Sequence, residues 1–203
     1  MPVYTAPMDG DDTLGRLHAW LQRHGLQDAG LAGVWDGRVT TCSFAVDDYL
    51  VRAGEHSDTL YVLDSGLVRL FYTTPDGRER NKAFYQTGDI TGPVSAAMTA
   101  TAAPFFIQCL EPVRAIAFGF EDLRRASLEY RPVAHLYTEL LAQAFIRNEQ
   151  REAMLLTCNA EQRYRWLLQH EPELVERVPQ FHLASYLGID AVSLSRLKRK
   201  LRD

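Results

Sequence analysis

Cysteine is scarce in this 203-residue chain, and the few that occur form no recognisable pattern. Cys42, Cys109 and Cys158 are widely spaced and include no Cys-x-x-Cys pair. An odd number of isolated cysteines supports neither a disulfide framework nor a cysteine-rich metal site. We therefore expect all three to behave as small buried hydrophobes, and we predict no metal ion and no cofactor.

Long apolar runs are also missing. No stretch of about 18 apolar residues occurs, and no basic segment followed by an apolar one opens the chain, which argues against a membrane span and a signal peptide. The Gly-x-Ser-x-Gly and phosphate-loop patterns of common enzymes are absent too. The sequence predicts a cytoplasmic protein that has no membrane partner and is not an enzyme.

An overall positive charge is the third thing the chain lacks, since its formal net charge is −4. The charge is unevenly distributed, because residues 159–203 hold eight Lys and Arg against six Asp and Glu, a net of +2. The remaining residues therefore carry −6. A small basic segment attached to an acidic body suits a protein that presents only one patch to phosphates.

That basic segment has the pattern of a helix-turn-helix. Gln180 follows Pro179 and can begin a short helix, and Gly188 supplies the permissive backbone that ends one. A second helix would then follow Asp190. If the two helices cross steeply, their shared interior consists of Leu183, Leu187, Ile189, Leu194 and Leu197.

The outward face of the second helix carries small, hydroxyl and basic side chains. In the DNA major groove Arg can pair with guanine, and Ser can reach a phosphate or a base edge. The alternative is an ordinary helical hairpin whose basic residues favour a helix C-terminus. The predicted DNA-binding residues are Gln180, Ala191, Val192, Ser193, Ser195, Arg196, Arg199 and Lys200, with Lys198 beside them.

The sequence of the first half of the chain predicts a β-roll. Short segments rich in β-branched and aromatic residues alternate with turn signals, among them Gly54, Gly66 and the sequence 75–77. Seven or eight such strands at regular spacing indicate a closed roll or jelly roll. The predicted strands are 39–44, 49–52, 59–63, 67–72, 80–86, 105–110 and 113–118.

Helices are expected on both sides of this roll. Residues 13–34 predict one or two short amphipathic helices, a helical region begins at 121, and 160–170 predicts a further helix ended by 171–173. A long helix is expected from Pro132 to about residue 157. The fold class is therefore α+β, with an N-terminal jelly roll, a long helix and a C-terminal helix-turn-helix.

The long helix has two apolar stripes. One stripe can face the roll while the other pairs with a second copy of the helix, unless both are buried within one subunit. The adjoining stripe holds Val133, Tyr137, Leu141, Phe145 and Leu155. The predicted dimer interface is Leu136, Leu140, Ala144, Arg147, Arg151 and Met154.

The order of these features resembles the cyclic-AMP receptor and fumarate-nitrate regulator (Crp/Fnr) family of bacterial transcription factors over about residues 15–203. The shared motifs are 54–55, 61–66, 76–79 and 88–89 in the roll, and 183–188 with 193–196 in the helix-turn-helix. This resemblance implies a homodimer that binds double-stranded DNA at a palindromic operator, with RNA polymerase as a further candidate partner. It divides the chain into a roll domain (1–120), a dimerisation helix (121–158) and a DNA-binding domain (159–203).

By the same resemblance, Arg196 matches the family's base-reading arginine. The polar residue usual earlier in that helix is replaced here by Ala191 and Val192, which can touch a thymine methyl but donate no hydrogen bond. The operator is therefore expected to differ from that of the best-known members.

The roll departs from the family where cyclic nucleotides bind. Cyclic-nucleotide-binding members carry a Gly-Glu pair for the ribose and an Arg-Ser or Arg-Thr pair for the phosphate, whereas this chain has 92–93 (Gly-Pro) and 103–104 (Ala-Pro). Burying a phosphate without its arginine costs several kcal/mol. We predict no response to cyclic AMP, and either a vestigial pocket or one for an apolar effector. The pocket residues would be Gly92, Pro93, Val94, Ser95, Ala103 and Pro104.

Two other functions fit parts of the sequence. One is a ligand-sensing roll protein whose helix-turn-helix has no DNA output. The other is a cupin-like metalloenzyme, which needs several converging histidines, whereas the roll offers only His56 as a candidate. No N-terminal cysteine set for an iron-sulfur cluster is present, and His56, His135 and His182 are predicted to be surface or interface residues rather than ligands.

Overall fold

The computed structural model describes residues 13–26, 35 and 37–201. The expected loose start at 1–12 and the expected helical continuation beyond residue 26 lie outside the described residues. Within the described part, contacts group the chain into two compact units. The roll unit holds the described residues up to Leu70 together with Phe84–Leu140, and the C-terminal unit holds Phe71–Ala83 together with the described residues from Leu141 onward.

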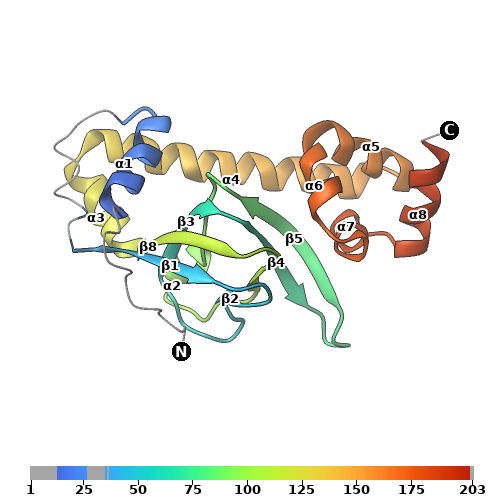
Figure 1. Cartoon of the computed structure of the whole chain (residues 1–203), viewed down its shortest axis with the longest axis horizontal. Coiled ribbons are helices and arrows are strands. Elements are labelled where there is room, and N and C mark those ends of the chain that lie inside the picture. The colour runs from blue at the N-terminus through green and yellow to red at the C-terminus, as the bar shows by residue number, and fades with distance from the viewer. Residues whose placement is uncertain (1–12, 27–34, 36, 202–203) are drawn as a thin grey trace. The chain divides into compact units, whose positions relative to one another are not determined.

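In the described residues, eight strands form two four-stranded sheets, and seven of the strands lie where the sequence predicts them. Figure 1 labels most of these strands in the roll. One sheet has the order β1-β8-β3-β6 and the other β2-β7-β4-β5. Strand β8 pairs antiparallel with both β1 and β3, in registers that set Val39 opposite Phe118 and Leu60 opposite the same residue. The strands are β1 (Val39–Phe44), β2 (Tyr49–Val51), β3 (Thr59–Ser65), β4 (Leu67–Thr73), β5 (Glu79–Gln86), β6 (Ile90–Thr91), β7 (Phe106–Cys109) and β8 (Val113–Gly119).

The helices follow the predicted order, and Figure 1 traces them from α1 to α8 at the C-terminal end. The α+β fold with a roll, a long helix and a C-terminal helical segment is therefore confirmed. The helices are α1 (Thr13–Arg23), α2 (Val94–Thr99), α3 (Phe120–Glu129), α4 (Arg131–Thr157), α5 (Ala160–His170), α6 (Pro172–Arg177), α7 (Gln180–Leu187) and α8 (Ala191–Lys200).

Three short elements were not predicted. Strand β6 is only two residues long, too short to show a period, and helix α2 lies in a run of small residues with no helical stripe. Helix α6 corrects the interpretation of 171–173 as a plain helix end. Pro172 lies in the first turn of α6, where a missing N–H and a fixed φ are compatible with a helix.

One apolar core holds the roll unit together. Side chains of β3 and β8 pack with Leu17, Trp20 and Leu21 of α1, and with the first part of α4. The indole Nε1 of Trp20 also donates to the Gly88 carbonyl at 2.8 Å, which ties α1 to the loop after β5. The remaining core members include Trp35, Leu60, Val62, Ile116, Phe118, Phe120, Leu123, Ala126, Val133 and Leu136.

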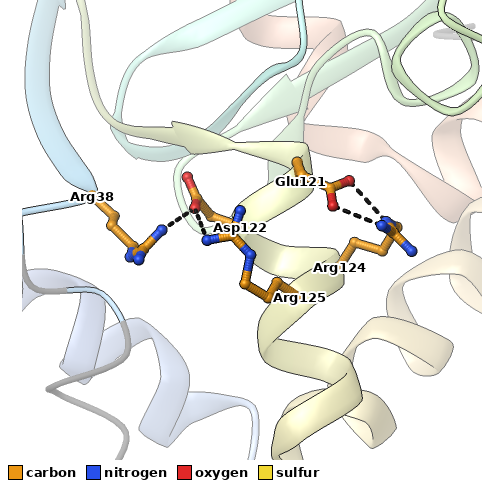
Figure 2. A network of polar contacts seen from close by, with 5 residues as sticks. All are labelled: Arg38, Glu121, Asp122, Arg124 and Arg125. Carbon is orange, nitrogen blue, oxygen red and sulfur yellow. Dashed lines mark hydrogen bonds and ion pairs between the residues drawn. The ribbon is translucent and has the colours of Figure 1, made fainter.

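The start of α3 carries a surface network of ion pairs (Figure 2). Asp122 accepts from Arg38 at 2.6 Å and lies 3.9 Å from Arg125, while Glu121 pairs with Arg124 at 2.7 Å. The two carboxylates lie in the first turn of α3, where the positive end of the helix dipole stabilises negative charge. Arg38, Glu121, Arg124 and Arg125 are exposed and only Asp122 is partly buried, so we assign this network to anchoring the helix start and not to ligand binding.

Gly66 at the β3–β4 turn provides a direct test of the roll geometry. Its φ of +100° is unfavourable for an L side chain, and an added Cβ would overlap the Pro112 carbonyl oxygen and lie 2.9 Å from Val113 Cγ2. We expect Gly66→Ala to lower the free energy of unfolding in urea by about 2–4 kcal/mol. Gly77→Ala is the control, since its φ is +79° with nothing within 4 Å, and it should cost only about 1 kcal/mol. Equal losses for the two variants would contradict this packing.

Candidate nucleic-acid interface

Helices α7 and α8 are joined by a turn that the sequence specifies locally. Gly188 ends α7 with a left-handed φ of +65°, and its N–H bonds back to the Ala184 and Ser185 carbonyls. Asp190 then begins α8 as its N-cap, because Asp190 Oδ1 accepts from the Ser193 N–H at 2.8 Å. The two helices of the predicted helix-turn-helix therefore form where the sequence places them.

The interior of this pair matches the predicted apolar pattern. Leu183, Leu187 and Leu194 are completely buried, while Ile189 and Leu197 are half-buried. Tyr186 is also buried, at 2% exposure, although it was not assigned to the interior from the sequence. Burial of these side chains on one side fixes which residues of α8 can point outward.

The outward face of α8 holds the residues expected from the sequence. Ala191, Val192, Arg196, Arg199 and Lys200 are exposed, with 60% of Val192 accessible. The two serines of the set, at 193 and 195, are half-buried. The guanidinium groups of Arg196 and Arg199 make no hydrogen bond or ion pair with the described residues, so both are available to an anionic partner.

Three of the predicted DNA-binding residues have partners within the chain. Ser193 Oγ donates to Asp190 Oδ2 at 2.6 Å, and Gln180 Nε2 donates to the Ala191 carbonyl at 3.1 Å. Lys200 Nζ pairs with Glu161 at 2.6 Å. Hydrogen bonds from Ser193 lower the pKa of Asp190, so this carboxylate stays ionised as a cap. The Ser193 hydroxyl can then only accept a hydrogen bond from a base or a water molecule.

Arg163 of α5 holds the ends of two other helices. Its guanidinium donates to the Leu155 and Cys158 carbonyls at the end of α4, at 2.8 and 2.9 Å, and to the Leu187 carbonyl at the end of α7, at 3.1 Å. These are carbonyls that a helix end leaves without an internal partner. Arg163 was not predicted as a structural residue, because its three partners lie at distances along the sequence that no local motif describes.

A buried polar network extends from the same helices. Arg151 of α4 donates to the Asn81 and Tyr186 carbonyls at 2.9 and 3.0 Å, and the Tyr186 hydroxyl donates to Glu171 at 3.2 Å. Burial is the main cause that raises the pKa of Glu171 and lowers the pKa of Arg151. Burial and then the nearby Arg147 and Arg151 charges lower the pKa of Lys82.

The predicted dimer stripe of α4 lies partly in the interior of the chain. Leu136 and Met154 are each only 3% exposed, and Leu140 packs on the core of the roll unit. These positions are therefore corrected from contact with a second copy to packing within one chain. Ala144, Arg147 and Arg151 are half-buried. The exposed apolar side chains of α4 are instead Leu141, Phe145, Ile146 and Leu156.

The predicted effector-pocket residues do not share one environment. Pro93 and Ala103 are buried, whereas Ser95 and Pro104 are exposed and Val94 is half-buried. The backbone of Ala103 pairs with Gly54 and Glu55, and Gly92 leaves no room for a Cβ, which would lie 2.8 Å from the Thr59 carbonyl oxygen. The buried part of this segment is thus apolar, and its role in effector binding remains a prediction.

The cysteines and histidines divide between interior and surface. Burial raises the pKa of the Cys42 and Cys109 thiols to about 12, as expected for inert core residues, while Cys158 is half-buried. His56 and His135 are exposed, but His182 is buried, which corrects its assignment to a surface or interface.

The described residues contain neither a candidate metal site nor a candidate membrane span. No group of three or more His, Cys, Asp or Glu side chains there could hold a metal ion. None of the described helices is both long and apolar enough to cross a membrane.

The sequence is similar to a known domain family and to a known regulatory protein. Residues 41–130 match the family described as the cyclic nucleotide-binding domain. The fumarate and nitrate reduction regulatory protein of Vibrio cholerae is 24% identical over 159 residues, which are 73% of this chain and 63% of that protein. The chain therefore aligns with less than two thirds of the length of this relative.

Solved structures share the fold at low sequence identity. FixK2 from Bradyrhizobium japonicum superposes with a TM-score of 0.72 at 20% identity, covering 81% of this chain and 84% of that one. A protein described as a transcriptional regulator of the Crp/Fnr family from Eubacterium rectale gives 0.66 at 15% identity, covering 89% and 85%. The fold is thus that of a cyclic-nucleotide-binding-type roll followed by a long helix and further helices. It is shared with proteins described as Crp/Fnr-family regulators.

The hydrogen bonds of Arg163 predict a stability difference between two arginines of the same helix. Arg163→Ala removes three charge-assisted bonds to helix-end carbonyls, so we expect it to lower the free energy of unfolding by about 2–4 kcal/mol. Arg165→Ala removes only an exposed pair with Glu161 and should cost about 0.5 kcal/mol or less. Urea unfolding followed by circular dichroism measures both, and a loss below 1 kcal/mol for Arg163→Ala would show that water replaces its contacts.

Proposed function

We propose that the chain is a homodimeric, sequence-specific DNA-binding transcriptional regulator. The observation that carries this proposal is the outward face of α8. There Arg196 and Arg199 are exposed, and their guanidinium groups have no partner among residues 13–26, 35 and 37–201, on a helix whose opposite side is buried. Such a helix suits the major groove, where a guanidinium can bind guanine through two hydrogen bonds. The similarity to the fumarate and nitrate reduction regulatory protein and to structures described as Crp/Fnr-family regulators supports the same assignment.

The proposed function assigns a role to each of three segments of the chain. Residues 1–120 form the roll domain, 121–158 the dimerisation segment and 159–203 the DNA-binding segment. Two copies related by a two-fold axis present two copies of α8, which fits a palindromic operator in double-stranded DNA. RNA polymerase is a further proposed partner, and the cytoplasm is the proposed location.

The dimer seam is proposed to use the exposed side of α4. Leu141, Phe145 and Ile146 lie within two turns of one another and expose 37%, 66% and 51% of their surfaces. Clustered apolar side chains of this size are unusual on the surface of a monomer. An isologous contact between two such helices would bury them together.

Independence from cyclic AMP is also proposed. The two positions that hold the ribose and the phosphate in cyclic-nucleotide-binding relatives are Pro93 and Ala103 here, and both are buried and apolar. Without a carboxylate and a guanidinium, the nucleotide would lose its hydration with no charge-assisted bonds in return. An apolar effector in this segment without DNA output is the second candidate function, which the buried Ala96, Ala103 and Phe105 favour.

Selection from a random pool of duplex DNA tests the main proposal. The purified full chain should retain specific sequences at moderate salt, with an affinity whose logarithm falls steeply with the logarithm of salt concentration. The same sequences should be recovered with and without added cyclic AMP. Failure to enrich any sequence would overturn the DNA-binding function, and cyclic-AMP-dependent enrichment would overturn the proposed independence.

Arg196 and Arg199 should have separable roles on the recovered duplex. We expect Arg196→Ala to reduce discrimination against a changed base pair by about 1–3 kcal/mol, because a bidentate contact to guanine would be lost. Arg199→Ala should weaken all sequences similarly and lower the salt slope by about one, as for a phosphate contact. Titrations with matched and mismatched duplexes measure both, and unchanged selectivity in Arg196→Ala would contradict its role in base reading.

The dimer seam can be tested by placing charges on α4. The double variant F145E and I146E should be monomeric by sedimentation equilibrium and should bind the operator more weakly, since buried apolar contacts would be replaced by like charges. Gln143→Glu, on an exposed polar position of the same helix, is the control and should remain a dimer. A dimeric double variant would show that the seam lies elsewhere.

A further inference from the structure

The hairpin formed by β4 and β5 belongs partly to the C-terminal unit. Its segment Phe71–Ala83 groups with the C-terminal helices and not with the rest of the roll. The contact is made by three residues that we call the hairpin latch: Asn81 of β5, and His182 and Ser185 of α7. Asn81 and His182 are only 2% and 6% exposed.

The backbone N–H, the backbone carbonyl and the side-chain Nδ2 of Asn81 are all hydrogen-bonded. Its N–H donates to Ser185 Oγ at 3.0 Å, and its carbonyl accepts from Arg151 at 2.9 Å. Its side-chain Nδ2 lies 3.0 Å from the His182 carbonyl oxygen and 3.2 Å from His182 Nδ1. Ser185 Oγ completes the set by donating to the Glu79 carbonyl at 3.0 Å.

These distances determine the protonation state of the imidazole in the closed latch. A backbone carbonyl can only accept, so the Asn81 atom beside it must be the amide nitrogen and not the amide oxygen. The same nitrogen is a donor only, so His182 Nδ1 must accept and cannot carry a hydrogen. His182 is therefore neutral, with its hydrogen on Nε2.

A proton on Nδ1 would oppose the closed latch in two ways. It would set an N–H against the Asn81 amide hydrogens, and turning the amide over would lose its bond to the His182 carbonyl. It would also add a positive charge to a buried contact whose neighbouring elements already carry several cations. Ionisable groups near the contact include Arg147 and Arg151 of α4, Glu171 between α5 and α6, and Tyr186 of α7. Strand β5 itself carries Glu79, Arg80, Lys82 and Tyr85, and α6, which packs against α7, carries Glu173, Glu176 and Arg177.

We infer that the hairpin latch is a proton-sensitive switch, in which neutral His182 holds β5 against α7 and protonation of His182 releases it. Proton binding and closure exclude one another, so acid favours the open latch. This inference rests on the proposed DNA-binding function for its output. Closure fixes α7, the first helix of the helix-turn-helix, so the closed latch is the DNA-binding state.

The sign of the effect separates this switch from ordinary electrostatics. Lowering the pH adds positive charge to a protein, which by itself strengthens binding to DNA phosphates. The latch predicts the opposite: between about pH 7.5 and about pH 5.5, where imidazoles titrate, affinity for the duplex recovered at pH 7.5 falls by about fivefold, the equivalent of one lost hydrogen bond. Salt concentration is held constant throughout.

His182→Asn is the matched variant, because its side-chain oxygen can take the place of Nδ1 as an acceptor but does not titrate. It should bind DNA at pH 5.5 at least as well as at pH 7.5. His170→Asn, at an exposed histidine of α5, is the control and should keep the fivefold loss of the unaltered chain. Identical pH profiles for the unaltered chain and His182→Asn, or an affinity that rises in acid in the unaltered chain, would overturn the inference.

Hydrogen exchange of the free protein tests the latch without DNA. Amide protection in residues 79–83, corrected for the intrinsic effect of pH, should fall in acid in the unaltered chain but not in His182→Asn. If His182→Asn does not fold, Ser185→Ala replaces it and should lower this protection at both pH values. Protection that is independent of pH in the unaltered chain would overturn the latch whatever the DNA result. A pH-dependent latch in a chain that binds no DNA would overturn the proposed function and the regulatory output together.

Discussion

The arrangement of the C-terminal helices depends on the hydrogen bonds made by the guanidinium of Arg163. It donates to carbonyls at the ends of both α4 and α7. Arg163 therefore fixes α7, the first helix of the helix-turn-helix, relative to α4. Carbonyls are acceptors without a formal charge, and three of them satisfy the cation without a buried carboxylate. The backbone at Gly188 makes this possible, since a Cβ there would lie 3.1 Å from the Arg163 Nη1 atom.

A second half-buried arginine, Arg151, also donates to backbone carbonyls of distant segments. It joins the carbonyl of Asn81 on the hairpin to that of Tyr186 on α7, and its guanidinium lies 4.8 Å from the Tyr186 ring centroid. Tyr186 in turn bonds to Glu171, whose carboxylate is mostly buried. The helix-turn-helix is therefore held in place by side chains that bridge distant segments of the chain, in addition to its leucine core.

Local patterns in the sequence predicted most of the fold. The seven predicted strands differ from their observed limits by at most two residues, because β-branched and aromatic segments alternate with glycine or proline turns. The helix-turn-helix was also predictable from the sequence, since Gly188 and five apolar positions specify its turn and its interior. Helix α6 was missed because Pro172 was interpreted as a terminator when it begins a helix.

The parts that sequence could not supply depend on long-range packing. Helix α4 has apolar residues on more than one side, and its own pattern does not show which side the roll covers. That is why Leu136 and Met154 were assigned to a dimer seam although the chain buries them. The contact of Asn81 with His182 spans 101 residues and joins two polar side chains, so neither a hydrophobic period nor a capping motif indicates it.

The hairpin also imposes an order on synthesis. Ser185 bonds to the Glu79 carbonyl 106 residues earlier, so the exposed edge of β5 leaves the ribosome long before the helix that covers it. At about 5–20 residues per second, this edge waits roughly 5–20 s for its partner. During that interval the polar and charged side chains of Glu79, Arg80, Asn81 and Lys82 face water. A strand edge with this composition resists pairing with other nascent chains, so the residues that later close the latch also protect the unfinished protein from aggregation.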